Sequence, residues 1–273
     1  MPRIQTRDGV ELYVKDQGQG PAVVLLHGWP LSADSFDDHA LALVEAGHRV
    51  VSYDRRGFGR SGQPWDGYDY DNLADDLADV VRAMGLDGFA LVGFSMGGGE
   101  VARYMSRHGG KGVTHAVLIS SVVPYVLRDD TNPDGVPEAT IEDMKAKIRE
   151  DRPHFYTSFF QQFYGVGYVT SPVSEEVLEW SRTVAMQGGL RATLACIDAF
   201  ARTDFRPDLA AFNVPTLVIH GTSDNTVPID ATGRAAAAAI PGATLIEYSG
   251  SPHGLLATDK QRSIDDLVGF LRG

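Results

Sequence analysis

Short apolar runs alternate with amphipathic stretches along most of the chain. Residues Val10–Asp16 alternate apolar and polar side chains, which predicts an early antiparallel strand with one buried face. Further runs are apolar on both faces and predict buried strands at Ala22–Leu26, His48–Tyr53, Phe89–Gly93, Val113–Ser120, Thr216–His220 and Thr244–Tyr248. Helical spacing predicts helices at Ala33–Glu45, Tyr70–Met84, Gly97–Arg107, Ala231–Ala239 and Asp259–Leu271. This alternation indicates an α/β fold with a mostly parallel sheet.

The regular alternation stops near Ser121 and resumes at Pro215. The segment between them predicts helices at Ile141–Glu150, Pro153–Tyr164, Ser174–Met186 and Gly189–Ala201. We therefore expect an α/β core at residues 1–120 and 213–273, with a helical cap inserted at 121–212. The cap is rich in aromatic side chains, and we expect about half of them to form its own core and the rest to line a ligand pocket.

Composition and charge narrow the class of protein. The 273 residues are 43% hydrophobic and 22% charged, as in ordinary folded domains. A net charge of −12, with no Lys/Arg-rich run, argues against nucleic acid or anionic lipid as a partner. The N-terminal segment does not resemble a signal peptide and no apolar run is long enough to span a bilayer, so we expect a cytoplasmic location. The single cysteine, Cys196, cannot form an intramolecular disulfide and has apolar neighbours, which predicts an inert buried thiol.

The strongest chemical motif is Gly93-Phe94-Ser95-Met96-Gly97, a G-x-S-x-G pattern between a predicted strand and a predicted helix. A serine on such a tight turn takes a strained backbone conformation, and side chains two residues away on either side would collide. Glycine at both positions removes those collisions. The helix that follows favours negative charge near the serine. Ser95 is therefore the candidate nucleophile.

A serine hydroxyl needs a base to take its proton, and the base needs an acid to fix its tautomer. In folds with this motif the chain order is nucleophile, acid, histidine. His253 is the histidine that follows the last predicted strand, and we interpret the histidines in other strands, helices and connections as structural: His39, His48, His108, His115, His154 and His220. Asp224 follows the preceding strand and is the candidate acid, with Asp230 as its rival because Asp230 could instead cap a helix.

Acyl transfer also needs N–H donors for the developing oxyanion. We expect one from Met96, directly after the nucleophile, and one from Trp29, in the loop after an early strand. Proline at position 30 has no N–H, so Trp29 is the last possible donor before it. The glycine-rich segment 54–62 lacks the lysine and spacing of a phosphate-binding loop, and we interpret it as structural bracing.

Taken together, these motifs resemble the α/β-hydrolase superfamily over nearly the whole chain, and most closely the cofactor-free (non-haem) haloperoxidases and related bacterial aryl esterases. The segments that carry the resemblance are HGWPLSADSF (27–36), YDRRGFGRSG (53–62), GFSMGGGEVARY (93–104), HGTSDNTVP (220–228) and SPHG (251–254). HGWP alone is less specific, since epoxide hydrolases carry similar turns. Those enzymes use an aspartate nucleophile, and Ser95 argues against that branch.

The resemblance implies an eight-stranded, mostly parallel sheet flanked by helices, with Ser95, Asp224 and His253 as the catalytic triad and Trp29 and Met96 as the oxyanion hole. It also implies hydrolysis of small esters and formation of peracids from short carboxylic acids and hydrogen peroxide. Neither a metal nor an organic cofactor is implied. Some of these enzymes assemble, so a homo-oligomer is expected. By the same resemblance, the acyl pocket falls at Val123, Phe160, Phe200, Thr226 and Val227.

Two other classes of function stay open at this stage. The same triad could serve a carbon–carbon bond hydrolase, a lactonase or lactamase, or a cofactor-free lyase. A non-catalytic small-molecule receptor that retains the triad is the third possibility, because a fold does not by itself determine function.

Overall fold

The structure, a computed structural model, describes residues 2–167 and 170–272. Its sheet has eight strands in the order β1-β2-β4-β3-β5-β6-β7-β8. Their bounds are β1 Arg3–Gln5, β2 Glu11–Gln17, β3 Ala22–Leu26, β4 Arg49–Tyr53, β5 Phe89–Phe94, β6 Val113–Ile119, β7 Thr216–Gly221 and β8 Thr244–Tyr248. Strands β1 and β2 are antiparallel to their neighbours, and all other pairs are parallel. The α/β fold and the mostly parallel sheet predicted from the sequence are therefore confirmed.

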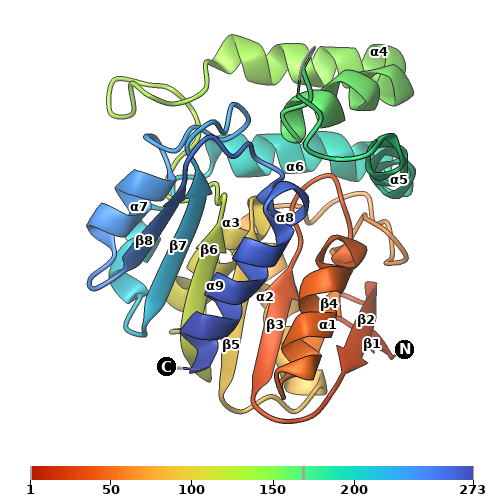
Figure 1. Ribbon diagram of the computed structural model, residues 1–273. Coiled ribbons are helices and arrows are strands. Elements are labelled where there is room, and N and C mark those ends of the chain that lie inside the picture. The colour runs from red at the N-terminus through yellow and green to blue at the C-terminus, as the bar shows by residue number, and fades with distance from the viewer. Residues whose placement is uncertain (1, 168–169, 273) are drawn as a thin grey trace.

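Helices cover both faces of this sheet (Figure 1). Helices α1 (Asp37–Glu45) and α9 (Lys260–Arg272) pack together on one face, and α2 (Tyr70–Ala83) and α3 (Met96–Arg107) cover the other. The remaining short elements are η1 (Ala33–Phe36), η2 (Arg206–Ala211), α7 (Gly233–Ala239) and α8 (Leu255–Thr258). Because β5 lies between these layers, all six of its residues are buried, which explains why its sequence is apolar throughout.

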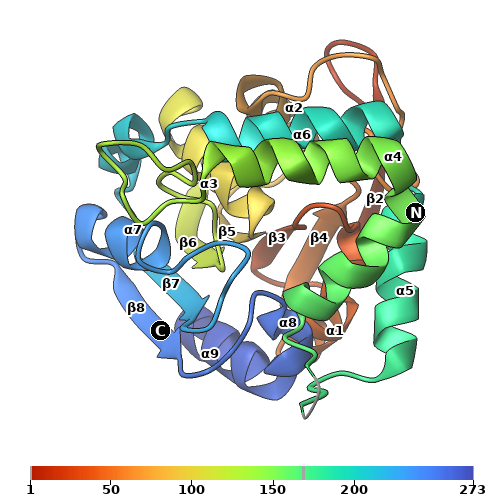
Figure 2. The same cartoon turned by 90° about the horizontal axis from the view of Figure 1, so that it is seen from above.

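The helices predicted between residues 121 and 212 lie above the carboxyl ends of the strands (Figure 1). They are α4 (Glu138–Phe163), α5 (Glu175–Met186) and α6 (Leu190–Arg202). Figure 2 shows that α4 consists of two arms at an angle, the first of them beside α6. The break is at Asp151, where φ is −153° and ψ is 87°. Pro153 disfavours a helix just before it, so the break falls between the two predicted helices.

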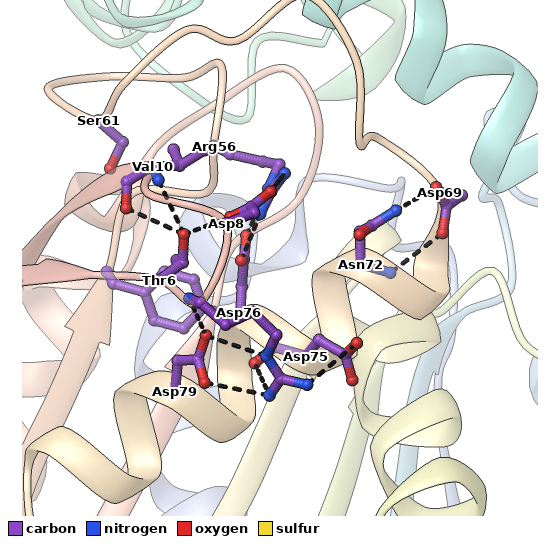
Figure 3. Close-up of polar contacts among 12 residues, drawn as sticks. Thr6, Asp8, Val10, Arg56, Ser61, Asp69, Asn72, Asp75, Asp76 and Asp79 are labelled. Atoms are coloured by element: carbon purple, nitrogen blue, oxygen red, sulfur yellow. Dashed lines mark hydrogen bonds and ion pairs between the residues drawn. The ribbon is translucent and has the colours of Figure 1, made fainter.

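Two neighbouring arginines brace the loop that follows β4. Arg56 binds Asp76 of α2 at 2.6 Å and Asp8 of the β1–β2 turn at 2.8 Å, as Figure 3 shows. Arg55 is completely buried, and its Nε donates to Glu100 of α3 at 2.5 Å. Tyr53 donates its hydroxyl to the other oxygen of Glu100. These contacts agree with the bracing role that the sequence indicates for segment 54–62.

Loss of one partner from a buried ion pair leaves a charge without solvent or a counter-ion, so Arg55→Met should lower the free energy of unfolding by about 3–5 kcal/mol. The double variant Arg55→Met/Glu100→Gln removes the unpaired carboxylate as well and should recover much of that loss. Urea denaturation of the three proteins measures both effects. A double variant as unstable as Arg55→Met would instead attribute the loss to packing.

Candidate active site

Ser95 lies on the turn between β5 and α3. Its φ is 53° and its ψ is −116°, a conformation that is unusual for a residue with a side chain. The backbone N–H of Ser95 donates to the carbonyl of Ile119 on β6 at 2.8 Å, which ties the turn to the neighbouring strand. The G-x-S-x-G pattern therefore forms the strand–turn–helix arrangement that its spacing predicts.

Three glycines allow the backbone to close around this turn. A Cβ atom on Gly93 would lie 2.5 Å from the carbonyl carbon of Gly97, and one on Gly97 would collide with the carbonyl oxygen of Leu26 on β3. A Cβ on Gly28 would lie 3.1 Å from the Cβ of Ser95. The same Cβ would lie 2.7 Å from the ring of Phe94, so the loop after β3 approaches the nucleophile turn too closely for a side chain at position 28 unless that ring moves.

His253 reaches Ser95 from the loop after β8. Its Nε2 is 2.9 Å from the Oγ of Ser95. The rings of Phe94 and Phe163 pack against the imidazole, with centroids 5.3 and 4.9 Å away. The backbone of β7 also helps to place this loop, because the absence of a side chain at Gly221 lets the carbonyl of Ser251 approach it.

Asp224 lies on the other side of the imidazole, in the turn after β7. Its Oδ2 is 2.6 Å from the Nδ1 of His253, and its Oδ1 accepts the N–H groups of Thr226 and Val227 at 2.9 and 2.8 Å. The rival Asp230 forms an exposed ion pair with Arg234. The structure therefore brings Ser95, His253 and Asp224 into one hydrogen-bonded chain.

The Asp224 carboxylate is ionised despite its burial. Burial alone would raise the pKa of this carboxyl, but the charge that His253 carries when it is protonated and the hydrogen bonds from His220 and His253 outweigh it and hold the pKa well below its usual range. An ionised carboxylate accepts the Nδ1–H of His253. That leaves Nε2 free to accept a proton from Ser95.

A cavity of about 230 Å³ opens beside Ser95 and His253. The ring of Trp29 forms part of its wall and packs edge-on against Phe159, with centroids 5.3 Å apart. The indole N–H of Trp29 donates to the carbonyl of Thr193 on α6 at 3.1 Å, which fixes the ring. Most of the remaining lining is apolar, as in sites for small organic ligands.

Three comparisons place the chain among known proteins. A sequence model of the alpha/beta hydrolase fold matches residues 21–260. A non-heme chloroperoxidase of Kitasatospora aureofaciens is 44% identical over 99% of both chains, and a bifunctional esterase/perhydrolase of Acinetobacter calcoaceticus is 41% identical over 100% of both. The crystal structure of a bromoperoxidase from Bacillus anthracis has a TM-score of 0.96 at 43% identity, covering 100% of this chain and 99% of that one.

The chain belongs to the α/β-hydrolase family. The relatives named above also support the predicted resemblance to the cofactor-free haloperoxidases and esterase/perhydrolases. Within the residues described here, no cluster of three or more His, Cys, Asp or Glu side chains is arranged to hold a metal ion. Likewise, no helix in the described ranges is long and apolar enough to cross a membrane.

The predicted pocket residues of this α/β-hydrolase are only partly brought together. Phe200, Thr226 and Val227 line the cavity, but Val123 and Phe160 are fully buried and lie outside its lining, where Val122 and Phe159 take their places. The position of Phe160 outside the cavity lining has a simple physical reason. Cavity-lining residues on the second arm of α4 recur at helical spacing, and position 160 lies outside that set, which is Phe155, Ser158, Phe159 and Gln162.

The cap aromatics divide between two roles. Phe155, Phe159 and Phe200 line the cavity, while Tyr156, Phe160 and Phe205 are buried in the core. Trp180, which is 40% exposed, and Tyr164, which shares a hydrogen bond with Ser181, both lie outside the lining of this cavity. Cys196 is buried, and burial raises the pKa of its thiol to about 12, which fits the predicted inert role.

Because Gly97 contacts the backbone of β3, Gly97→Ala should destabilise the α/β-hydrolase by about 1–3 kcal/mol. Alanine is otherwise the better helix former, so a loss of stability identifies the collision as its cause. Gly269→Ala in α9 is the matched control, because the new Cβ would meet no atom within 4 Å. This substitution should raise the free energy of unfolding by about 0.5–1 kcal/mol. Thermal unfolding of both variants measures the difference, and a stabilised Gly97→Ala variant would contradict it.

The lowered pKa of Asp224 links its ionisation to stability. The ionised group contributes stability at pH values above the ordinary aspartate pKa of 3.8, and this contribution is lost as the pH falls through the native pKa. The difference in unfolding free energy between wild type and Asp224→Asn should therefore narrow below about pH 4. Urea denaturation from pH 7 to pH 3 tests this, and a constant difference would argue against it.

Proposed function

We propose that this α/β-hydrolase is a serine esterase for small carboxylic esters and that it also forms peracids from short carboxylic acids and hydrogen peroxide. The observation that carries the proposal is the hydrogen-bonded chain from Ser95 through His253 to Asp224, next to an apolar cavity. The names of the relatives, a non-heme chloroperoxidase and a bifunctional esterase/perhydrolase, favour the second activity.

In the first half-reaction, the Oγ of Ser95 attacks the ester carbonyl carbon while the Nε2 of His253 takes the hydroxyl proton. Asp224 stabilises the imidazolium that results. The backbone N–H groups of Trp29 and Met96 are the proposed donors to the oxyanion. The imidazolium then gives its proton to the leaving alkoxide, which departs as the alcohol and leaves an acyl group on Ser95.

In the second half-reaction, His253 takes a proton from water or from hydrogen peroxide, and the oxygen attacks the acyl carbon. Ser95 leaves with the proton, so water gives the carboxylic acid and peroxide gives the peracid. A short carboxylic acid can acylate Ser95 in the same way, with water as the leaving group. A released peracid oxidises bromide or chloride in solution, which accounts for a haloperoxidase activity without a redox cofactor.

The shape and chemistry of the cavity favour small, largely apolar acyl and alcohol groups, since its lining includes Val122, Val126, Ile141, Phe159 and Phe200. One methylene in such a pocket changes binding by only about 1–3 kcal/mol, so we propose a preference among small esters and not a single ester. We further propose a cytoplasmic location, with which the buried free thiol of Cys196 is compatible, and a homo-oligomeric state.

Replacement of the nucleophile is the direct test of the esterase mechanism. Ser95→Ala should lower kcat for an aryl acetate by about 10⁴-fold or more, because no acyl-enzyme can form. An organophosphonate should label the wild type at Ser95 and leave the variant unlabelled, as mass spectrometry would show. A wild type that binds ligands in the cavity but is not labelled would instead point to a receptor.

The perhydrolase activity is tested by bromination of a diketone with bromide and hydrogen peroxide. We expect bromination in acetate buffer, little in a buffer without carboxylate, and none above background with Ser95→Ala. Ester hydrolysis without acetate-dependent bromination would reduce the proposal to a plain esterase. Absence of both activities would favour a carbon–carbon bond hydrolase, a lactonase or a cofactor-free lyase.

A further inference from the structure

A second histidine, His220, contacts the carboxylate of Asp224. It is completely buried near the end of β7, where the sequence suggests only a structural role. Its Nε2 lies 3.0 Å from the carbonyl oxygen of Val227 and 3.2 Å from the Oδ2 of Asp224. The same Oδ2 lies 2.6 Å from the Nδ1 of His253. One carboxylate oxygen is therefore shared by two imidazole rings.

The surroundings of His220 determine which of its nitrogens carries the proton. Both neighbours of Nε2, the carbonyl of Val227 and the carboxylate of Asp224, are acceptors, so Nε2 must be the donor. Nδ1 is buried and has no hydrogen-bond partner among the residues that the structure describes. A second proton, on Nδ1, would be buried without an acceptor, so the neutral ring is favoured. His220 therefore offers Asp224 an N–H dipole and not a positive charge.

The position of this imidazole is fixed from several sides. A Cβ atom on Gly233 would lie 2.6 Å from its Nδ1, so the ring packs directly against the backbone at the start of α7. Val227 closes a small circuit, because its carbonyl accepts from His220 while its N–H donates to the Oδ1 of Asp224 at 2.8 Å. A shift of His220 would therefore move both oxygens of the carboxylate.

We propose that His220 is a positioning residue of the active site, whose neutral Nε2–H orients the Asp224 carboxylate toward His253 without cancelling its charge. The inference rests on the proposed function in that it takes Asp224 as the acid of the triad. The lack of charge matters. A cation at position 220 would compete with the His253 imidazolium for the carboxylate and would weaken the stabilisation that acyl transfer requires.

The test compares three replacements of His220 in the full-length protein. Gln places an amide N–H near the position of Nε2, Asn places one near the position of Nδ1, and Leu keeps the bulk without any donor. His220→Leu and His220→Asn should lower kcat for an aryl acetate by about 10- to 100-fold with little change in KM, as expected when an N–H group that lies 3.2 Å from the ionised carboxylate is removed. His220→Gln should retain most of the activity.

His39→Leu is the matched control. His39 is also a buried histidine with one bonded nitrogen, 2.8 Å from the Oγ of Ser263, and an Nδ1 without a partner among the described residues. It lies on α1, and its one hydrogen bond in the described part of the chain goes to α9 and not to a triad residue. We expect it to lower the melting temperature and to leave kcat unchanged. Nuclear magnetic resonance supplies a second readout. The low-field proton between His253 and Asp224 should shift in His220→Leu and stay in place in His39→Leu.

A double-mutant cycle separates positioning from general destabilisation. In an Asp224→Asn background, His220→Leu should cost less than about threefold in the rate of Ser95 labelling by an organophosphonate, because no carboxylate remains to be oriented. If His220→Leu lowers the labelling rate by the same factor in the wild-type and the Asp224→Asn backgrounds, the proposal is overturned. A folded His220→Leu variant with the kcat of the wild type would also overturn it. If that variant does not fold, equal activity of His220→Gln and His220→Asn would overturn it.

These readouts also separate this inference from the proposed function. Labelling of Ser95 and the low-field resonance require no ester turnover. A wild type that hydrolyses no ester would refute the esterase proposal, while the labelling rates and the resonance would still decide the role of His220.

Discussion

The close packing of backbone around Ser95 is the constraint on which the rest of the site depends. The turn between β5 and α3 forces Ser95 into a strained conformation with a positive φ, and the turn closes only because Gly93 and Gly97 carry no side chains. This turn places the Ser95 hydroxyl at the carboxyl end of the sheet, where the loops after β3, β7 and β8 meet. Interactions elsewhere must hold this geometry, since a strained residue persists only where its surroundings determine it.

Buried charges supply part of that rigidity. The ion pair of Arg55 with Glu100 ties the loop after β4 to α3, the helix that begins directly after Ser95, and Arg55 also donates to the carbonyl of His27 at 2.5 Å. The imidazole of His27 accepts the backbone N–H of Arg55 at 2.9 Å. The loop that carries Trp29 is thereby linked through Arg55 to α3. A buried ion pair adds little net stability, so its value here lies in fixed geometry.

How far the sequence predicts such a site depends on whether each feature is local. The turn at Ser95, the break in α4 and most strands follow from patterns within a few residues. The edge strand β1 was not predicted from the pattern, because only Ile4 among its three residues is buried. One apolar residue is too few to show an alternation. The cavity is lined by Val122 and Phe159, where Val123 and Phe160 were expected. Which neighbour faces the cavity depends on how the loop and the helix are rotated against the core, and a sequence pattern does not define that rotation to within one residue.

His220 shows the same limit in a sharper form. A histidine in an apolar strand looks structural, and its only local signal is the position four residues before Asp224. That spacing becomes informative once the turn is seen to fold back, so that Val227 bonds both residues. Two imidazoles then share one anion, yet their roles differ because their surroundings differ. His253 has Ser95 as a partner for its second nitrogen and can exchange a proton there. The second nitrogen of His220 has no hydrogen-bond partner among the described residues and cannot.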